Sequence, residues 1–303
     1  MNKFINKKFI IVNKFRNKRF VGGNCKELSI LEEIPIGASF MPVYTGICDS
    51  HNIIIKMCDI NESLIAQILQ NDENLYVVKL YNILDYSTIK CFDSKDIIKV
   101  DTTNNYIIIE KLKPLILYSY YEYKSMRKYP HIIHEFNLKY NGVKIEIICI
   151  YITKDLIKIL IKCASIIQYL HSKKIFYGDL KQENMGIDEN GNFKIFDFGE
   201  SRIIESTKYI GEYKQHPFQN DILALGKLFI NILTKRNVFI VGEHYEKDVF
   251  PLEQIHFEIL FQKLIINNPV ITDYLKRMLN INIKDYDDTI LNELLCYLKS
   301  LLI

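Results

Sequence analysis

Two kinds of hydrophobic spacing divide the chain. Between Ile34 and Glu110, short β-branched runs such as Ile53–Ile55 and Ile107–Ile109 are bounded by turn-forming residues, which is typical of antiparallel strands. From Lys154 onward, apolar residues recur every three or four positions, which is typical of amphipathic helices. These helical sets are Leu156, Leu160, Cys163, Ile167 and Leu170, and then Ile222, Leu225, Phe229 and Leu233. The pattern predicts an α+β fold with a strand-rich part and a helical part.

The stretch between these halves, residues 113–151, fits neither spacing. Residues Leu138–Ile145 carry Asn141–Gly142 between short apolar runs, which predicts a β-hairpin that turns at Asn-Gly. We therefore treat 113–151 as a candidate insertion. We expect a basic N-terminal segment at 1–33, a small lobe at 34–110 and a large lobe at 111–303.

The composition is that of an ordinary globular chain. Of its 303 residues 49% are hydrophobic and 25% are charged, and the net charge of +3 demands neither a nucleic acid nor a membrane as partner. The seven cysteines are scattered and form no C-x-x-C pair, which predicts neither a disulfide framework nor a zinc site. No apolar run approaches the roughly 20 residues of a transmembrane helix. We therefore expect a soluble, intracellular, cytoplasmic protein.

The first nineteen residues contain seven basic side chains and no acid. A docking arm or a targeting peptide would have this composition, but the apolar residues fall in short runs and no cleavage signal follows. We favour a solvated tail or a first strand whose basic side chains face water.

A set of polar residues between Asp179 and Asp197 stands at a distinctive spacing. Asp179-Leu-Lys181-Gln-Glu-Asn184 is followed by Asp197-Phe-Gly, and Tyr-Leu-His-Ser precedes both, beginning at Tyr169. This string resembles H-R-D-L-K-x-x-N followed by D-F-G, the catalytic motifs of the eukaryotic-type protein kinase superfamily. The resemblance implies a bilobal protein-kinase-like fold, with a small β-rich N-lobe and a larger helical C-lobe. It also implies ATP as the phosphoryl donor and Mg²⁺ as the metal.

The resemblance assigns a role to each residue of the string. Asp179 would accept the proton of the acceptor hydroxyl, and Lys181 would steady the transferred phosphoryl group. Asn184 and Asp197 would bind Mg²⁺. Asp221, in Asp-Ile-Leu-Ala-Leu-Gly, resembles the buried Asp that anchors the catalytic loop in this family.

Upstream, Ile-Ile-Ile-Lys56 resembles the V-A-I-K strand, whose Lys reaches the α- and β-phosphates. Residues 36–44 precede it and resemble the glycine-rich hairpin G-x-G-x-x-G-x-V, in which Gly37 and Val43 remain and most glycines are lost. Because glycine lets backbone N–H groups approach phosphate closely, the loss predicts a looser or differently shaped lid over ATP.

Two glutamates compete as the ion-pair partner of Lys56. Glu62 begins Glu-Ser-Leu-Ile-Ala-Gln-Ile-Leu, which resembles the family's helix. Glu73 has the more familiar separation from Lys56, and Val77, Leu80 and Leu84 would then share its helical face. We favour Glu62 on residue pattern.

The run Tyr106-Ile-Ile-Ile-Glu110-Lys-Leu112 resembles the last strand of the small lobe and the hinge that follows it. The resemblance implies that backbone groups of Glu110 and Leu112 meet the adenine edge, and that Ile109 is the gatekeeper.

The chain also departs from the family. Tyr177 and Gly178 replace the His and Arg of H-R-D, so we expect that phosphorylation of the activation loop is not the switch. The nearest match to A-P-E is His216-Pro217-Phe218.

Since every residue that contacts metal or phosphate in the template is present, we expect an active Ser/Thr protein kinase. Lys181 favours Ser/Thr acceptors in proteins over a small-molecule acceptor. The alternative is a pseudokinase that acts as a binding scaffold, which the eroded glycine loop and A-P-E motif would fit. We expect a monomer that acts on protein substrates and binds no specific nucleic acid.

Overall fold

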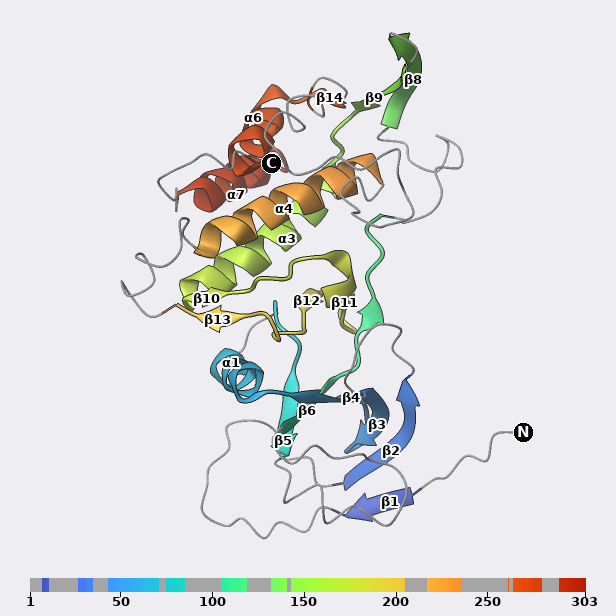
Figure 1. Ribbon diagram of the computed structural model, residues 1–303, viewed down its shortest axis with the longest axis vertical. Coiled ribbons are helices and arrows are strands. Elements are labelled where there is room, and N and C mark those ends of the chain that lie inside the picture. Colours follow the sequence, from blue (N-terminus) through green and yellow to red (C-terminus); the bar gives the residue numbers. More distant parts are fainter. Residues whose placement is uncertain are drawn as a thin grey trace, which may run out of the picture. The chain divides into compact units, whose positions relative to one another are not determined.

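The computed structural model describes residues 7–10, 27–34, 43–70, 75–84, 105–118, 132–140, 143–204, 217–235, 261, 264–279 and 289–303. The chain forms two compact units, and Figure 1 shows their elements. The first unit comprises Met1–Pro114 and Asn184–Ile203, and the second comprises Leu115–Glu183 and Ile204–Ile303. The first is rich in strands and the second is rich in helices, so the predicted α+β class is confirmed.

The first unit is built on a six-stranded sheet in the order β1-β2-β3-β4-β6-β5. Its strands pair antiparallel throughout. They are β1 (Lys7–Ile10), β2 (Glu27–Ile34), β3 (Val43–Cys48), β4 (His51–Cys58), β5 (Leu80–Leu84) and β6 (Asn105–Glu110). Strands β1 and β2 belong to the stretch expected as a separate basic segment at 1–33, but they extend this sheet.

Alternation along β4 and β6 gives the sheet two different faces. Ile53, Ile55, Tyr106 and Ile108 pack with Tyr44 in one buried cluster. Because successive side chains point to opposite faces, the residues between them, such as Ile54 and Lys56, face the other way. The register Ile54↔Ile109 and Lys56↔Ile107 aligns these positions across the two strands. One face therefore forms a core, and the other is left to line a pocket.

Helix α1 (Ile60–Gln70) follows β4 directly. Asp59 caps its first turn, since the Glu62 N–H donates to Asp59 Oδ1 at 2.7 Å. A second, three-stranded sheet in the order β12-β11-β7 completes the first unit. It joins β7 (Lys113–Pro114), β11 (Met185–Ile187) and β12 (Phe193–Ile195), and β13 (Arg202–Ile203) ends the unit.

The second unit is organised around two long helices, α3 (Lys154–Ser172) and α4 (Pro217–Thr234). Thr153 caps α3, because its side chain accepts the Leu156 N–H. Helix α3 packs against α4 and α7 (Ile290–Ser300), and α4 packs against α6 (Pro269–Leu279). The apolar spacing predicted α3 and α4.

A hairpin and two short strands complete the second unit. Strands β8 (Ile132–Tyr140) and β9 (Val143–Ile150) pair antiparallel, with Tyr140 opposite Val143, so the two arms of the predicted hairpin are confirmed, while its turn residues lie outside the described residues. Strand β14 (Leu264–Ile266) pairs with β9 in parallel. Strand β10 (Ile175–Phe176) follows α3.

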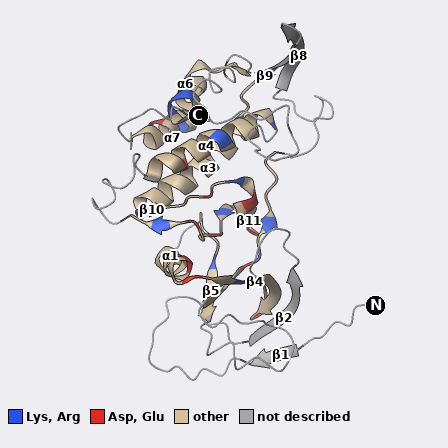
Figure 2. Cartoon of the chain, viewed as in Figure 1, with Lys and Arg blue, Asp and Glu red and all other residues tan. Residues whose placement is uncertain are grey.

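Basic and acidic residues are spread over the described elements of both units (Figure 2). None of the described helices is both long and apolar enough to cross a bilayer. Cys58, Cys149, Cys163 and Cys296 are free thiols. Cys48 is disulfide-bonded, which its spacing from the other cysteines did not predict.

The core of the second unit can be tested at Leu160, which is fully buried on α3. We expect Leu160→Ala to lower the free energy of unfolding by about 2–5 kcal/mol, because the deleted methyl groups leave a cavity. Denaturant unfolding followed by circular dichroism measures the change.

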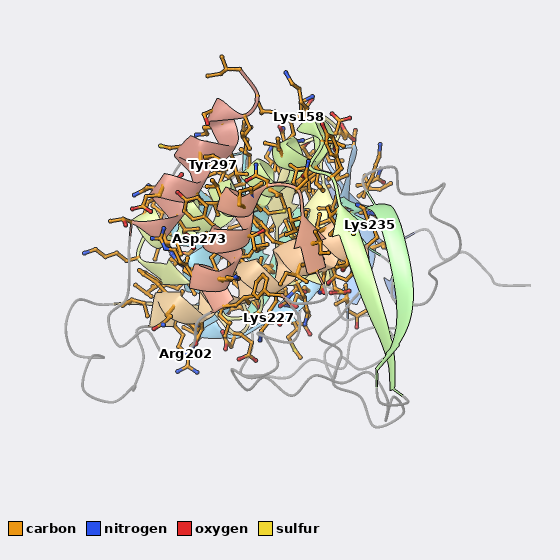
Figure 3. The ribbon with its side chains drawn as sticks, turned by 90° about the horizontal axis from the view of Figure 1, so that it is seen from above. Lys158, Arg202, Lys227, Lys235, Asp273 and Tyr297 are labelled. Carbon is orange, nitrogen blue, oxygen red and sulfur yellow. The ribbon has the colours of Figure 1, made fainter. Side chains whose placement is uncertain are left out.

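The matched control is Lys158→Ala on the same helix, where the side chain is exposed (Figure 3). This change should shift the free energy of unfolding by no more than about 0.5 kcal/mol. Equal effects of the two changes would contradict the assignment of Leu160 to the core.

Candidate functional site

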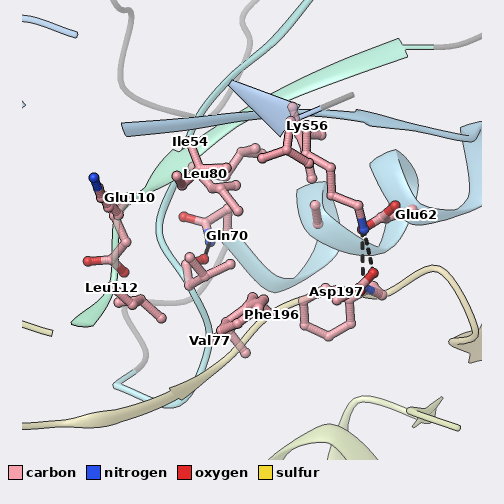
Figure 4. A pocket seen from close by; sticks show the side chains of 17 residues that line it. Ile54, Lys56, Glu62, Gln70, Val77, Leu80, Glu110, Leu112, Phe196 and Asp197 are labelled. Atoms are coloured by element: carbon pink, nitrogen blue, oxygen red, sulfur yellow. Dashed lines mark hydrogen bonds and ion pairs between the residues drawn. The ribbon is translucent and has the colours of Figure 1, made fainter. Parts of the chain in front are cut away.

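The first unit contains a pocket of about 350 Å³ on the face of the sheet opposite its core. Its walls are mainly apolar and come from β3, β4, β5, β6 and the segment before β5. These residues include Val43, Ile54, Val77, Leu80, Ile107 and Ile109. The strand alternation that buries the core thus also supplies the pocket wall (Figure 4).

One end of the pocket carries three charged side chains. Lys56 Nζ donates to Glu62 Oε1 at 2.9 Å and also contacts Asp197 Oδ1. Glu62 Oε1 accepts the Phe198 N–H as well, at 3.1 Å. Glu62 therefore holds both the lysine and the backbone next to Asp197, and Figure 4 shows the three groups together.

Local structure explains how these groups meet. Lys56 lies on the pocket face of β4, and Glu62 lies in the first turn of α1, where a carboxylate also interacts favourably with the helix dipole. Asp197 adopts φ of 65°, in the left-handed region that few non-glycine residues enter. Asn61 Nδ2 donates to Ser201 O at 2.7 Å, so α1 also holds the segment after Asp197.

The charges of this cluster depend on each other. Burial lowers the pKa of Lys56, but the carboxylates of Glu62 and Asp197 outweigh burial and raise it above its ordinary value. Burial also raises the pKa of Glu62, against the attraction of Lys56. Because Glu62 Oε1 accepts from two donors, we take the charged pair as the state at neutral pH.

The opposite end of the pocket is formed by Glu110, Lys111 and Leu112. The backbone N–H of Glu110 donates to Lys79 O at 2.9 Å, and that of Lys111 donates to Asn52 O at 3.1 Å. These two bonds fix the backbone just before Leu112.

A polar cluster that the sequence analysis missed lies beside this end. Lys194 on β12 is buried and contacts Glu110 Oε1, which also accepts the Lys79 N–H at 2.6 Å. Lys194 Nζ lies 3.5 Å from Asp188 Oδ2. The cluster fastens the hinge segment to the strand pair that leads to Asp197.

Asn184 is buried immediately before β11. Its backbone carbonyl accepts the N–H of Phe196 at 3.0 Å. Asn184 is therefore held beside the residue that precedes Asp197.

The second unit holds Asp179, Lys181 and Asp221. Lys181 Nζ lies 2.7 Å from Asp179 Oδ2, and both side chains are partly exposed. Asp221 is 1% exposed and accepts the N–H groups of Tyr177 and Gly178, each at 2.9 Å. Its Oδ2 also lies 2.9 Å from His171 Nε2. The carboxylate of Asp221 thus fixes the backbone just before Asp179.

Two residues of the loop around Asp179, Gly178 and Gln182, have structural roles that the motifs alone do not indicate. Gly178 has φ of 86°, so the residue in place of the motif arginine lies in a conformation that favours glycine. Gln182 was missed by sequence reasoning, yet its Oε1 accepts the N–H groups of Leu117 and Tyr118. It joins the loop to the segment after the hinge.

Three further residues were predicted from the sequence as part of the nucleotide site or as the partner of Lys56. Val43 on β3 lines the pocket. Gly37 and Glu73 lie outside the described residues. The helical face that the Glu73 alternative required is wrong, because Leu80–Leu84 is strand β5.

The charge of Asp188 gives a test by pH. Burial raises the pKa of Asp188, but hydrogen bonds from Asn192 and Asn190 and the charge of Lys194 outweigh burial and hold the pKa below its ordinary value. Because its pKa is lower in the folded protein, the ionised Asp188 stabilises the fold fully at a pH above the pKa of the unfolded state, about 3.9. This stabilisation is lost as the pH falls through the pKa of the folded state.

We therefore expect Asp188→Asn to destabilise the protein at neutral pH, by an amount that shrinks as pH falls below about 4. Denaturant unfolding of both proteins across this range measures the difference. The control Asp155→Asn, at an exposed site in the first turn of α3, should change the free energy of unfolding by no more than about 1 kcal/mol at any pH. A difference for Asp188→Asn that is independent of pH would contradict the account.

Comparison with known proteins gives the family of the chain. The protein kinase domain model matches residues 69–285, more than two thirds of the chain. An alignment 94 positions long, which covers 25% of this chain and 7% of the relative, shows 38% identity to Serine/threonine-protein kinase RUNKEL from Arabidopsis thaliana. A stretch of 43 residues, 14% of the chain, is 49% identical to 11% of cAMP-dependent protein kinase type 3 from Saccharomyces cerevisiae.

CBL-interacting serine/threonine-protein kinase 20 from Arabidopsis thaliana is 49% identical over 45 residues, which are 15% of this chain and 10% of that protein. The chain therefore spans only about a tenth or less of the length of these relatives. The family match includes Glu110, Asp179 and Asp197. Lys56 lies before the matched residues, and its contacts with Glu62 and Asp197 place it in the same cluster. From its motifs, its α+β fold and this match, the chain belongs to the protein kinase family.

Proposed function

We propose that the chain transfers the γ-phosphoryl group of ATP to Ser or Thr hydroxyls of protein substrates. The observation that carries the proposal is the pocket of the first unit, which is apolar at one end and holds Lys56, Glu62 and Asp197 at the other. Apolar pockets with a few convergent polar groups are typical small-molecule sites. A purine base suits the apolar end, and a triphosphate suits the end with the lysine.

Lys56 would bind the α- and β-phosphates of the nucleotide. Glu62 supports this role because it holds Nζ at 2.9 Å while it also accepts the Phe198 N–H. Phosphoryl transfer relies mainly on positioning and on neutralisation of charge, so a lysine fixed by a buried carboxylate is well suited to it.

Asp197 and Asn184 would hold Mg²⁺. Asp197 is partly exposed, and its Oδ2 has no hydrogen-bond partner among the residues that the structure describes. Carboxylate and amide oxygens are the kind of ligand that Mg²⁺ prefers, so this donor set fits the metal. When bound, Mg²⁺ would neutralise charge on the phosphates.

Asp179 would accept the proton of the acceptor hydroxyl while the hydroxyl oxygen forms a bond to the γ-phosphorus. In the same transfer the bond between the γ-phosphorus and the β–γ bridging oxygen breaks, and ADP leaves. Asp221 supports this role, because it fixes the backbone of Tyr177 and Gly178 directly before the base. Lys181, beside Asp179 at 2.7 Å, supports Ser/Thr acceptors through its likeness to that branch of the family.

The second candidate function is that of a pseudokinase scaffold. One observation favours it: the lid hairpin at 36–44 has lost most of its glycines, which would weaken its hold on the phosphates while leaving the fold able to bind partners.

The decisive test compares wild type with Asp179→Asn. Purified protein is incubated with labelled ATP, Mg²⁺ and generic protein acceptors, and labelled phosphoserine and phosphothreonine are measured. Loss of a general base typically costs about 10²–10⁴-fold in rate, so we expect at least a hundredfold loss. Binding of ATP should change little, because Asp179 lies outside the pocket residues.

The control is Asp155→Asn, an exposed carboxylate on α3, which should leave transfer unchanged. Transfer at the same background rate by wild type and Asp179→Asn would reject the enzyme. If wild type then still bound a partner tightly, the scaffold function would stand.

A further inference from the structure

A buried glycine on β11 lies next to the apolar end of the pocket. Gly186 is opposite Pro114 of β7 and Lys194 of β12 in the three-stranded sheet. Gly186 is not among the residues with positive φ, so its backbone conformation does not require glycine. Glycine is required because neighbouring atoms leave no space for a side chain.

Leu112 occupies the space that a side chain at Gly186 would fill. A Cβ added there would lie 2.5 Å from Leu112 Cβ and 2.9 Å from Leu112 Cδ1, closer than real Cβ atoms approach. It would also lie 3.1 Å from the carbonyl oxygen of Lys113. The methyl group could be accommodated only if Leu112 moved.

The backbone leaves Leu112 little room to withdraw. Lys113 and Pro114, which follow it, are paired with Ile187 and Gly186 of β11. Leu112 lines the pocket, at the end away from Lys56 and Asp197 (Figure 4). A larger residue at 186 would therefore push the Leu112 side chain toward the pocket, where the base would bind.

We propose that Gly186 is a positioning residue for nucleotide binding. It acts through Leu112: the absent side chain lets Leu112 lie against β11 and keeps the apolar end of the pocket open for a purine base. The proposal rests on the proposed function for the identity of the ligand. The packing of Leu112 on Gly186 does not depend on it.

The test uses Gly186→Ala, Leu112→Ala and the double variant. Titration calorimetry with Mg·ATP measures the Kd, and thermal unfolding measures the melting temperature. We expect Gly186→Ala to weaken Mg·ATP binding at least tenfold. In the double variant the smaller residue at 112 makes room for the methyl group, so its Kd should return to within threefold of that of Leu112→Ala.

The matched control is Gly191→Ala on the turn between β11 and β12. Gly191 has φ of 82°, and an added Cβ would meet no atom within 4 Å. This change should lower the melting temperature through backbone strain and leave the Kd within twofold of wild type. General destabilisation by an alanine is thus separated from displacement of Leu112.

Two results would overturn the proposal while the proposed function stands. Either Gly186→Ala binds Mg·ATP as wild type does, or the double variant binds as weakly as Gly186→Ala. If wild type binds no Mg·ATP, the proposed function fails, and melting temperatures then decide the packing claim. A double variant that melts above Gly186→Ala supports the claim, and one that melts no higher rejects it.

Discussion

The candidate site depends on one buried carboxylate, Glu62. A single oxygen of this residue accepts both the Lys56 ammonium and the Phe198 N–H, so it connects strand β4, helix α1 and the segment that carries Asp197. An unpaired charge at such a buried position would cost several kcal/mol, typically about 3–5 kcal/mol when one partner of a buried pair is removed. The need to pair the buried charge of Glu62 therefore brings Lys56, which is suited to phosphate, next to Asp197, which is suited to metal.

A second constraint is the strict alternation of β4 and β6. Ile53, Ile55 and Ile108 fill the core, and Ile54, Lys56 and Ile109 line the pocket. A shift of register by one residue would exchange the two sets and place Lys56 in the core. The fold of the first unit and the chemistry of its pocket are thus two consequences of one pattern.

Much of this could be predicted from local pattern. Strands β4 and β6, helices α3 and α4 and the hairpin at Asn141–Gly142 follow from periodicity and turn chemistry. The Lys194–Glu110 contact joins residues 84 positions apart, and the Gln182–Leu117 bond joins residues 65 apart. The spacing of residues along the sequence does not predict such long-range pairs, because a charged or amide side chain is also common on a solvated surface. The role of Gly186 was equally hidden, since it is set by one neighbouring leucine.

The central claim is that the charged end of the pocket binds the phosphates of ATP with Mg²⁺. Calorimetric titration of ATP, with and without Mg²⁺, into wild type, Lys56→Met and Lys79→Met tests it most directly. Lys79 is exposed and does not line the pocket, so it controls for loss of a positive charge. We expect Mg²⁺-dependent binding by wild type and Lys79→Met and at least tenfold weaker binding by Lys56→Met. Equal affinities of the two variants, or no binding by wild type, would contradict the claim.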